Sequence, residues 1–174
     1  MGLPINQGGL PVVTAAEMYR AEDLGTKSGT TKLELMENAC RSVVSEISAR
    51  WTPRKTLIVC GPGQNGGDGL GVACLLRRRR WPVEVALENP TKVFLGNTKI
   101  MAERWGGAYL DLASVQVEEY VLVIDALYGI GLNRALSGYV VEFLQELNRY
   151  KIDVVAIDIP SGVSADTGQA LGGC

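Results

Sequence analysis

The stretch GPGQNGGDG, residues 61–69, directly follows the apolar run TLIVC of residues 56–60. Glycines at this density either let backbone N–H groups approach a ligand, usually a phosphate, or let the chain turn sharply. The apolar run is typical of a strand, and the segment behind it, residues 68–80, is long enough for a helix. We therefore expect a strand, a glycine-rich turn and a helix in that order.

The same alternation continues along the chain. Four runs are apolar on both faces, as strands of a covered parallel sheet must be, at residues 57–60, 83–87, 121–124 and 154–157. Segments long enough for crossover helices lie between them, at residues 68–80, 97–105 and 138–150. Strands that alternate with helices predict a three-layer α/β fold with right-handed crossovers. With 47% hydrophobic content, residues 1–174 are enough for one domain.

Two helices are predicted before the first strand. Thr14 with Glu17, and Thr31 with Glu34, each fit a capping box that opens a helix. Gly25 is placed to end the first helix, and the second helix runs to about residue 50. The apolar residues of the second helix recur at helical spacing and predict one core-facing side: Leu33, Met36, Cys40, Val43 and Ile47.

Composition argues against several classes of function. With 17 Lys and Arg against 19 Asp and Glu the net charge is −2, so no basic surface suggests nucleic acid or an anionic membrane as partner. The four cysteines lack zinc-ligand spacing and indicate a reducing compartment. The N-terminus lacks signal-peptide features, and no apolar stretch approaches the roughly 20 residues of a membrane span, so we expect a cytoplasmic protein. Because histidine is absent, any general acid or base must be Asp, Glu, Lys, Tyr or Cys.

Polar, glycine-bearing loops follow three of the four predicted strands. In an open parallel sheet, ligands bind beyond the carboxyl ends of the strands. Asn65, Asp125 and Ser161 lie at or just beyond such ends and offer an amide, a carboxylate and a hydroxyl oxygen. A single formal charge suits a monovalent cation better than Mg²⁺ or Ca²⁺. Each residue also has a purely structural interpretation, as a turn residue, a cap or a local hydrogen-bonding group.

Residues 61–66 also satisfy the dinucleotide fingerprint G-x-G-x-x-G, with Glu88 about 20 residues further on. A nicotinamide dehydrogenase is nevertheless disfavoured, because the loop continues as Gly67-Asp68 and nothing resembles an acid for hydride transfer. The loop also lacks the Lys-Ser/Thr ending of a Walker A loop. An anion-binding nest at a helix start, with Asn65 and Asp68 offering oxygen atoms beside it, is the remaining interpretation.

Four motifs stand along the chain: LMENA at residues 35–39, GPGQNGGDGL at 61–70, DALYGIGL at 125–132 and AIDIPSGVSADTG at 156–168. Together they resemble the YjeF N-terminal domain family, the NAD(P)H-hydrate epimerases. Such proteins interconvert the R and S forms of hydrated nicotinamide cofactors, and a fused or separate dehydratase then restores the S form with ADP or ATP. The resemblance implies a Rossmann-like α/β/α sandwich with a mainly parallel sheet, a bound potassium ion and, commonly, a homodimer.

The resemblance also implies roles for individual residues. The potassium ligands would be Asn65, Asp125 and Ser161. The substrate would contact Asp158, the segment Gln64, Asn65, Gly66, Gly67 and Asp68, and the segment Gly129, Ile130, Gly131, Leu132, Asn133, Arg134 and Ala135.

Asp158 is the candidate catalytic residue. Epimerisation requires the hydroxylated ring carbon to become planar, most simply by loss of hydroxide and return of water on the other face, which needs proton delivery and removal. Ring opening at the same carbon is a second route, and a static role in holding the substrate is the competing interpretation of Asp158. The alternative function is a non-catalytic YjeF-type nucleotide-binding or dimerisation module, and the intact loops count against it.

Three features depart from the family pattern. Gln64 stands where asparagine is usual, and Cys40 stands where glycine is usual, which would crowd a close helix approach. The chain ends 13 residues after Ser161, whereas family domains continue through further strand and helix segments. We therefore expect the C-terminal part of the domain to be absent from this chain.

Overall fold

The computed structural model describes residues 12–172. We predicted that the N-terminus is not a signal peptide, and most of that segment lies outside the described residues. The helices are α1 (Ala15–Lys27), α2 (Lys32–Arg50), α3 (Gln64–Arg78), α4 (Gly96–Trp105) and α5 (Tyr139–Tyr150). The strands are β1 (Thr56–Cys60), β2 (Val83–Leu87), β3 (Leu110–Asp111), β4 (Leu122–Ala126) and β5 (Asp153–Ala156). Two 3₁₀ turns precede β4, η1 (Leu112–Ser114) and η2 (Val117–Glu119).

The five strands form one parallel sheet in the order β3-β2-β1-β4-β5, which confirms the predicted parallel arrangement. β1 is central, and its Thr56 is in register with Val83 of β2 and with Leu122 of β4. The chain proceeds from β1 to β2 on one side and later returns to β4 on the other, so the strand order reverses between β1 and β4. In open α/β sheets, ligand sites form beyond the carboxyl ends of the strands at this reversal.

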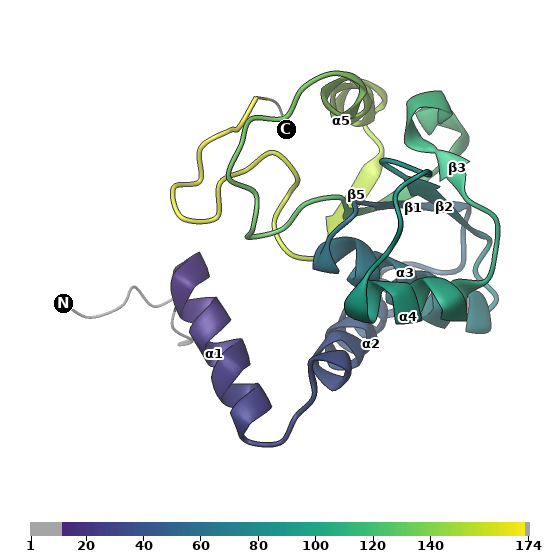
Figure 1. The fold of residues 1–174 in the computed structure, drawn as a ribbon. Coiled ribbons are helices and arrows are strands. Elements are labelled where there is room, and N and C mark those ends of the chain that lie inside the picture. Colours follow the sequence, from purple (N-terminus) through teal and green to yellow (C-terminus); the bar gives the residue numbers. More distant parts are fainter. Residues whose placement is uncertain (1–11, 173–174) are drawn as a thin grey trace.

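Helices cover both faces of the sheet, as Figure 1 shows. α2, α3 and α4 lie on one face, where Ile58, Leu70 and Met101 belong to one buried cluster. α5 lies on the opposite face, where Leu57 and Phe143 belong to a second cluster. Successive residues of β1 therefore face different layers, which is why this strand is apolar throughout. The predicted three-layer α/β/α sandwich is confirmed.

Helix α3 begins at Gln64, four residues earlier than predicted, so the glycine-rich motif forms helical turns and not only a loop. A Cβ atom on Gly66 would lie 1.9 Å from the carbonyl oxygen of Gly61, and one on Gly69 would lie 2.5 Å from Cβ of Ala126. Neither position has room for a side chain. These glycines allow α3 to pack closely on β1 and β4, a use of glycine distinct from ligand approach or a sharp turn.

Cys40 shows how the departure from the family pattern is accommodated. It is buried in α2, and its Sγ donates a hydrogen bond of 3.3 Å to the carbonyl oxygen of Asp68. A Cβ atom on Gly71 would lie 2.4 Å from this sulfur, so the absence of a side chain on α3 provides the room that α2 lacks. The expected crowding is thus relieved by a glycine on the neighbouring helix.

Both predicted capping boxes are present, at Thr14 with Glu17 and at Thr31 with Glu34. The buried residues of α2 are Met36, Cys40, Val44 and Ile47. The predicted core-facing residues Leu33 and Val43 are half-buried and pack against the same cluster, which confirms the predicted apolar side of this helix. Among residues 12–172, no helix is long and apolar enough to cross a membrane.

Three parts of the sheet differ from the prediction. β5 was expected to be buried on both faces, but Val154 is 45% exposed because β5 is an edge strand. β4 ends two residues later than predicted, which places Asp125 within the strand and not beyond it. β3 and the 3₁₀ turns were not predicted, because elements of two or three residues carry no periodic signal.

Helix α1 stands apart from the helical layers and lies near the C-terminal segment, as Figure 1 shows. It has no buried residue, and it ends at Lys27, two residues beyond the predicted Gly25. The backbone N–H of Ala15 donates a hydrogen bond of 2.9 Å to Oδ1 of Asp166. This bond joins the start of α1 to a segment about 150 residues away, and it brings α1 to the carboxyl side of the sheet.

Candidate functional site

A cavity of about 560 Å³ opens at the carboxyl edge of the sheet, where the strand order reverses. Its wall is formed by the start of α3, the loop after β4, the residues that directly follow β5 and one side of α1. The lining residues are Met18, Tyr19, Glu22, Ala39, Pro62, Gly63, Gln64, Asn65, Asp68, Leu127, Tyr128, Gly129, Ile130, Gly131, Leu132, Asn133, Arg134, Ile157 and Asp158. The cavity therefore brings together residues from three of the four motifs noted in the sequence, with Ala39 from the fourth.

Most residues predicted to bind a substrate line this cavity: Gln64, Asn65, Asp68, Gly129, Ile130, Gly131, Leu132, Asn133, Arg134 and Asp158. Gly66 and Gly67 do not line it, because both are buried against neighbouring backbone and side chains. Ala135 also lies outside the lining, and its predicted contact remains a prediction.

The sequence did not predict the contribution of α1 to the wall. Met18, Tyr19 and Glu22 reach the cavity from this helix. They are exposed on a helix that buries nothing, so their apolar and acidic character fits an ordinary solvent-facing surface equally well. Only the position of α1 in three dimensions identifies them.

Asp125 and Ser161 contact each other, are both buried and are not among the residues that line the cavity. The Ser161 hydroxyl donates a hydrogen bond of 2.7 Å to Oδ1 of Asp125, and the Ser161 backbone N–H donates one of 2.8 Å to Oδ2. The backbone N–H of Leu127 donates a third bond to Oδ1, at 3.1 Å. Burial raises the pKa of Asp125, while the bonds from Ser161 and Leu127 counteract that rise. Within residues 12–172, no basic side chain forms an ion pair with Asp125.

Asn65 has an unusual side-chain environment. Its amide oxygen and nitrogen are both buried, and neither has a hydrogen-bond partner within the described chain. Asn65 lies in the first turn of α3, which follows β1. Asp125 lies on β4, the strand next to β1, in register with Val59. The unpartnered amide oxygen of Asn65 and the joined carboxylate and hydroxyl of Asp125 and Ser161 are hard oxygen donors with one formal charge, which suits a weakly charged cation such as K⁺.

Asp158 is held at the cavity wall by the loop after β4. Its Oδ2 accepts a hydrogen bond of 2.8 Å from the backbone N–H of Ile130. A Cβ atom on Gly129 would lie 2.2 Å from the same oxygen, so only glycine leaves room for the carboxylate. The DALYG motif thus places both a donor and a gap opposite Asp158.

Asp68 carries a carboxyl group with a perturbed pKa. Burial raises its pKa to about 7, and the nearby charges of Asp158 and Glu22 add to the rise. The cavity therefore holds a carboxyl group that titrates near neutral pH, which is a property of acid and base catalysts.

Glu88 does not behave as the dinucleotide fingerprint requires. Its carboxylate accepts a hydrogen bond from the Tyr128 hydroxyl, and its carbonyl oxygen accepts one from the Tyr139 hydroxyl. Glu88 is not among the residues that line the cavity. This arrangement counts against the dehydrogenase interpretation, in which the residue would bind a ribose.

A parallel α/β/α sandwich with an acidic cavity at its strand reversal defines a Rossmann-like protein with a ligand site at the carboxyl edge of the sheet. More particularly, the chain belongs to the family described as YjeF-related protein N-terminus, which matches residues 32–174. The crystal structure of a yeast protein has the same fold, with a TM-score of 0.74 at 23% identity, covering 88% of this chain and 72% of the yeast chain.

Two relatives are informative. The NAD(P)H-hydrate epimerase of Rhodobacter capsulatus is 37% identical over 167 residues, which cover 89% of this chain and 78% of the relative. The bifunctional NAD(P)H-hydrate repair enzyme of Synechocystis is 34% identical over 169 residues, which cover 92% of this chain but only 31% of the relative. This chain thus corresponds to most of the first protein and to about a third of the second.

Proposed function

We propose that this protein is an isomerase that interconverts the R and S forms of NAD(P)H hydrate. The observation that carries the proposal is the cavity itself, which gathers Gln64, Asn65 and Asp68 from one motif, residues 129–134 from another and Asp158 from a third. Relatives named NAD(P)H-hydrate epimerase, one of them matched over 78% of its length, support the same substrate and reaction.

The reaction requires the hydroxylated ring carbon to lose its configuration and regain it in either sense. Protonation of the departing oxygen, a planar ring cation and addition of water to the other face accomplish this, with proton transfer at both steps. The acidic cavity suits the reaction, because negative charge stabilises a ring that becomes cationic. Asp158 is available for proton transfer, although the bond from Ile130 also suits a purely positioning role.

A potassium ion is the cofactor that we propose for this protein. Asn65, Asp125 and Ser161 would hold it, and the unpartnered amide of Asn65 supports this assignment. Such an ion would offset the repulsion between the Asp125 carboxylate and the phosphates of the substrate.

We further propose a cytoplasmic homodimer that works with an ADP- or ATP-dependent dehydratase, fused or separate. The free thiols of Cys40, Cys60 and Cys74 support a reducing compartment. The bifunctional repair enzymes among the relatives, of which this chain matches about a third, support the link to a second activity.

A coupled assay tests the reaction. Purified R-hydrate is mixed with a dehydratase that accepts only the S form, and the return of NADH or NADPH is followed with and without this protein. We expect complete conversion of the R form at a rate that rises with protein concentration. Conversion at the spontaneous rate only would leave the non-catalytic, nucleotide-binding or dimerisation module as the better account.

A further inference from the structure

A smaller cavity of about 110 Å³ adjoins the main one, between α1, α2 and α3. Its lining residues are Glu22, Lys32, Leu35, Met36, Ala39, Gln64 and Asp68. Glu22, Ala39, Gln64 and Asp68 also line the main cavity, so the smaller one is a side chamber of the same site.

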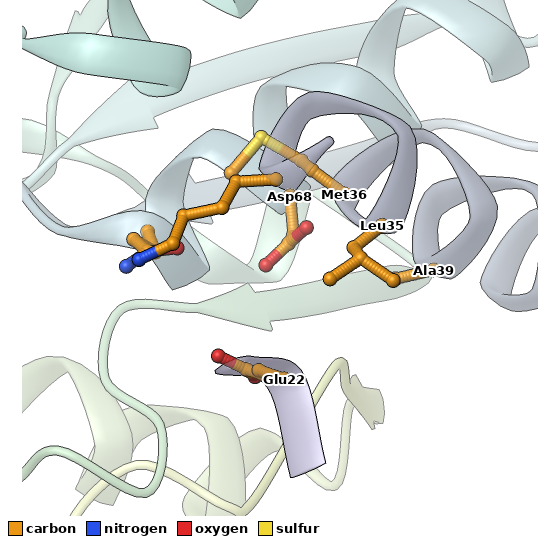
Figure 2. A pocket seen from close by; sticks show the side chains of 7 residues that line it. Glu22, Leu35, Met36, Ala39 and Asp68 are labelled. Carbon is orange, nitrogen blue, oxygen red and sulfur yellow. The ribbon is translucent and has the colours of Figure 1, made fainter. Parts of the chain in front are cut away.

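The side chamber gives the LMENA motif a place in the site. Leu35, Met36 and Ala39 line the chamber from α2, and Figure 2 shows the Asp68 carboxylate next to Leu35, with Glu22 of α1 below them. An apolar wall beside a carboxyl group suits a flat ring that carries a hydroxyl group. Met36 also belongs to the buried core, whereas Leu35 is only half-buried and Ala39 is exposed, so the chamber gives these two residues a place that core packing does not.

The two aspartates of the site have contrasting surroundings. Asp158 accepts a hydrogen bond of 2.8 Å from the backbone N–H of Ile130. The Asp68 side chain receives no hydrogen bond within residues 12–172, and it is largely withdrawn from water beside two other carboxyl groups. Pairs of carboxyl groups whose environments differ in this way divide the roles of acid and base between them.

We propose that Asp68 is a catalytic residue that protonates the departing hydroxyl group, while Asp158 takes the proton from the returning water. The proposal rests on the epimerase function proposed above. In it, the hydrated ring sits against Leu35, Met36 and Ala39, with its hydroxyl group directed to Asp68.

Asp68 gives its proton to the hydroxyl oxygen, the C–O bond breaks and its electron pair leaves with water, while the lone pair of the ring nitrogen forms a C=N bond. Water then adds to the opposite face, the C=N pair returns to nitrogen, and the proton of the added water passes to Asp158. In the reverse direction the two residues exchange roles, and solvent restores their protonation between turnovers.

Other charged or titratable groups lie around the two cavities that Asp68 lines. Tyr19, Glu22, Lys32, Arg134 and Asp158 line one or both cavities with Asp68, and the Cys40 thiol donates a hydrogen bond to the Asp68 backbone carbonyl. Of these groups, Asp158 and Glu22 carry the charges that raise the pKa of Asp68, in addition to its burial.

The test compares Asp68→Asn with Asp23→Asn, a matched change on the exposed surface of α1 that lies outside both cavities. For Asp68→Asn we expect kcat to fall by at least about 100-fold, while the Kd of the hydrate changes by less than about 3-fold. Wild-type kcat should decline above a pH of about 7, and the residual rate of Asp68→Asn should not.

Two results would overturn the proposal and are distinguishable. If the wild type accelerates epimerisation but Asp68→Asn keeps more than about a tenth of its kcat, Asp68 is not the acid and the proposed function stands. If the wild type gives no acceleration, the proposed function fails and this assignment fails with it. Circular dichroism and thermal unfolding of both variants confirm that lost activity does not reflect lost fold.

Discussion

The Ser161 hydroxyl donates a hydrogen bond of 2.7 Å to Oδ1 of Asp125, which fastens the segment after β5 to strand β4. The same hydroxyl accepts a bond of 3.0 Å from the backbone N–H of Tyr128. One buried serine therefore joins two loops at the carboxyl edge, the loops that carry Asp158 and residues 129–134 into the cavity.

Ser161→Ala should destabilise the fold by about 1–3 kcal/mol, because it leaves the Tyr128 N–H without its acceptor and Asp125 without one donor. Urea unfolding monitored by circular dichroism measures the change. Ser45→Ala, an exposed position on α2, is the matched control and should shift stability by less than about 0.5 kcal/mol. Equal effects of the two substitutions would show that the Ser161 bonds contribute little.

Asn65→Leu tests the cation site through stability alone. Because the Asn65 amide is buried and unpartnered, we expect the leucine variant to be at least as stable as the wild type in buffer without potassium. Adding KCl should raise the Tm of the wild type and leave that of the variant unchanged, with choline chloride at equal ionic strength as the control. A wild type that responds equally to KCl and choline chloride would argue against a potassium site.

Gly129→Ala should displace the Asp158 carboxylate. The added Cβ would lie 2.2 Å from Oδ2 of Asp158, so the carboxylate must leave the Ile130 N–H. We expect kcat/KM to fall by at least about 10-fold with little loss of Tm. Gly25→Ala on α1, where a Cβ would meet nothing within 4 Å, is the control, and similar kinetics of the two variants would contradict the predicted role of this contact.

The pH dependence of stability should carry the signature of Asp68. Its folded pKa of about 7 lies above the ordinary aspartate value of 3.8, so the folded protein binds more protons than the unfolded chain between these two pH values. The stability that protonated Asp68 contributes at low pH is therefore lost as the pH rises from about 4 to about 7. At pH 8, Asp68→Asn should be more stable than the wild type by about 2–4 kcal/mol, and at pH 4 the difference should nearly vanish. Urea unfolding at both pH values measures it, and parallel pH profiles would contradict it.

The sequence predicted the parts of the fold that depend on local pattern. β1 and β2 were predicted within one residue because their apolar runs are uninterrupted, and both capping boxes were correct because Thr14 and Thr31 satisfy their own helices locally. The start of α3 was placed too late, since Gly66 and Gly69 are poor helix formers. Their close packing on β1 and β4 outweighs that propensity, and a single sequence does not reveal such packing.

The site was predictable only in part for the same reason. Motifs at strand ends identified Asn65, Asp68 and Asp158, because parallel strands bring their carboxyl ends to one edge. The contribution of Glu22 depends on the placement of α1, which a hydrogen bond between Ala15 and a residue far along the chain supports. The burial of the Asp68 carboxyl group likewise arises from tertiary contacts.

The measurement that tests the central claim most directly starts from pure R-hydrate and, separately, from pure S-hydrate, and follows both forms by chromatography without any dehydratase or nucleotide added. The account predicts that catalytic amounts of this protein bring both mixtures to the same R to S ratio, far faster than buffer alone and at a rate proportional to protein concentration. Time courses that coincide with those in buffer alone, from either starting form, would contradict it.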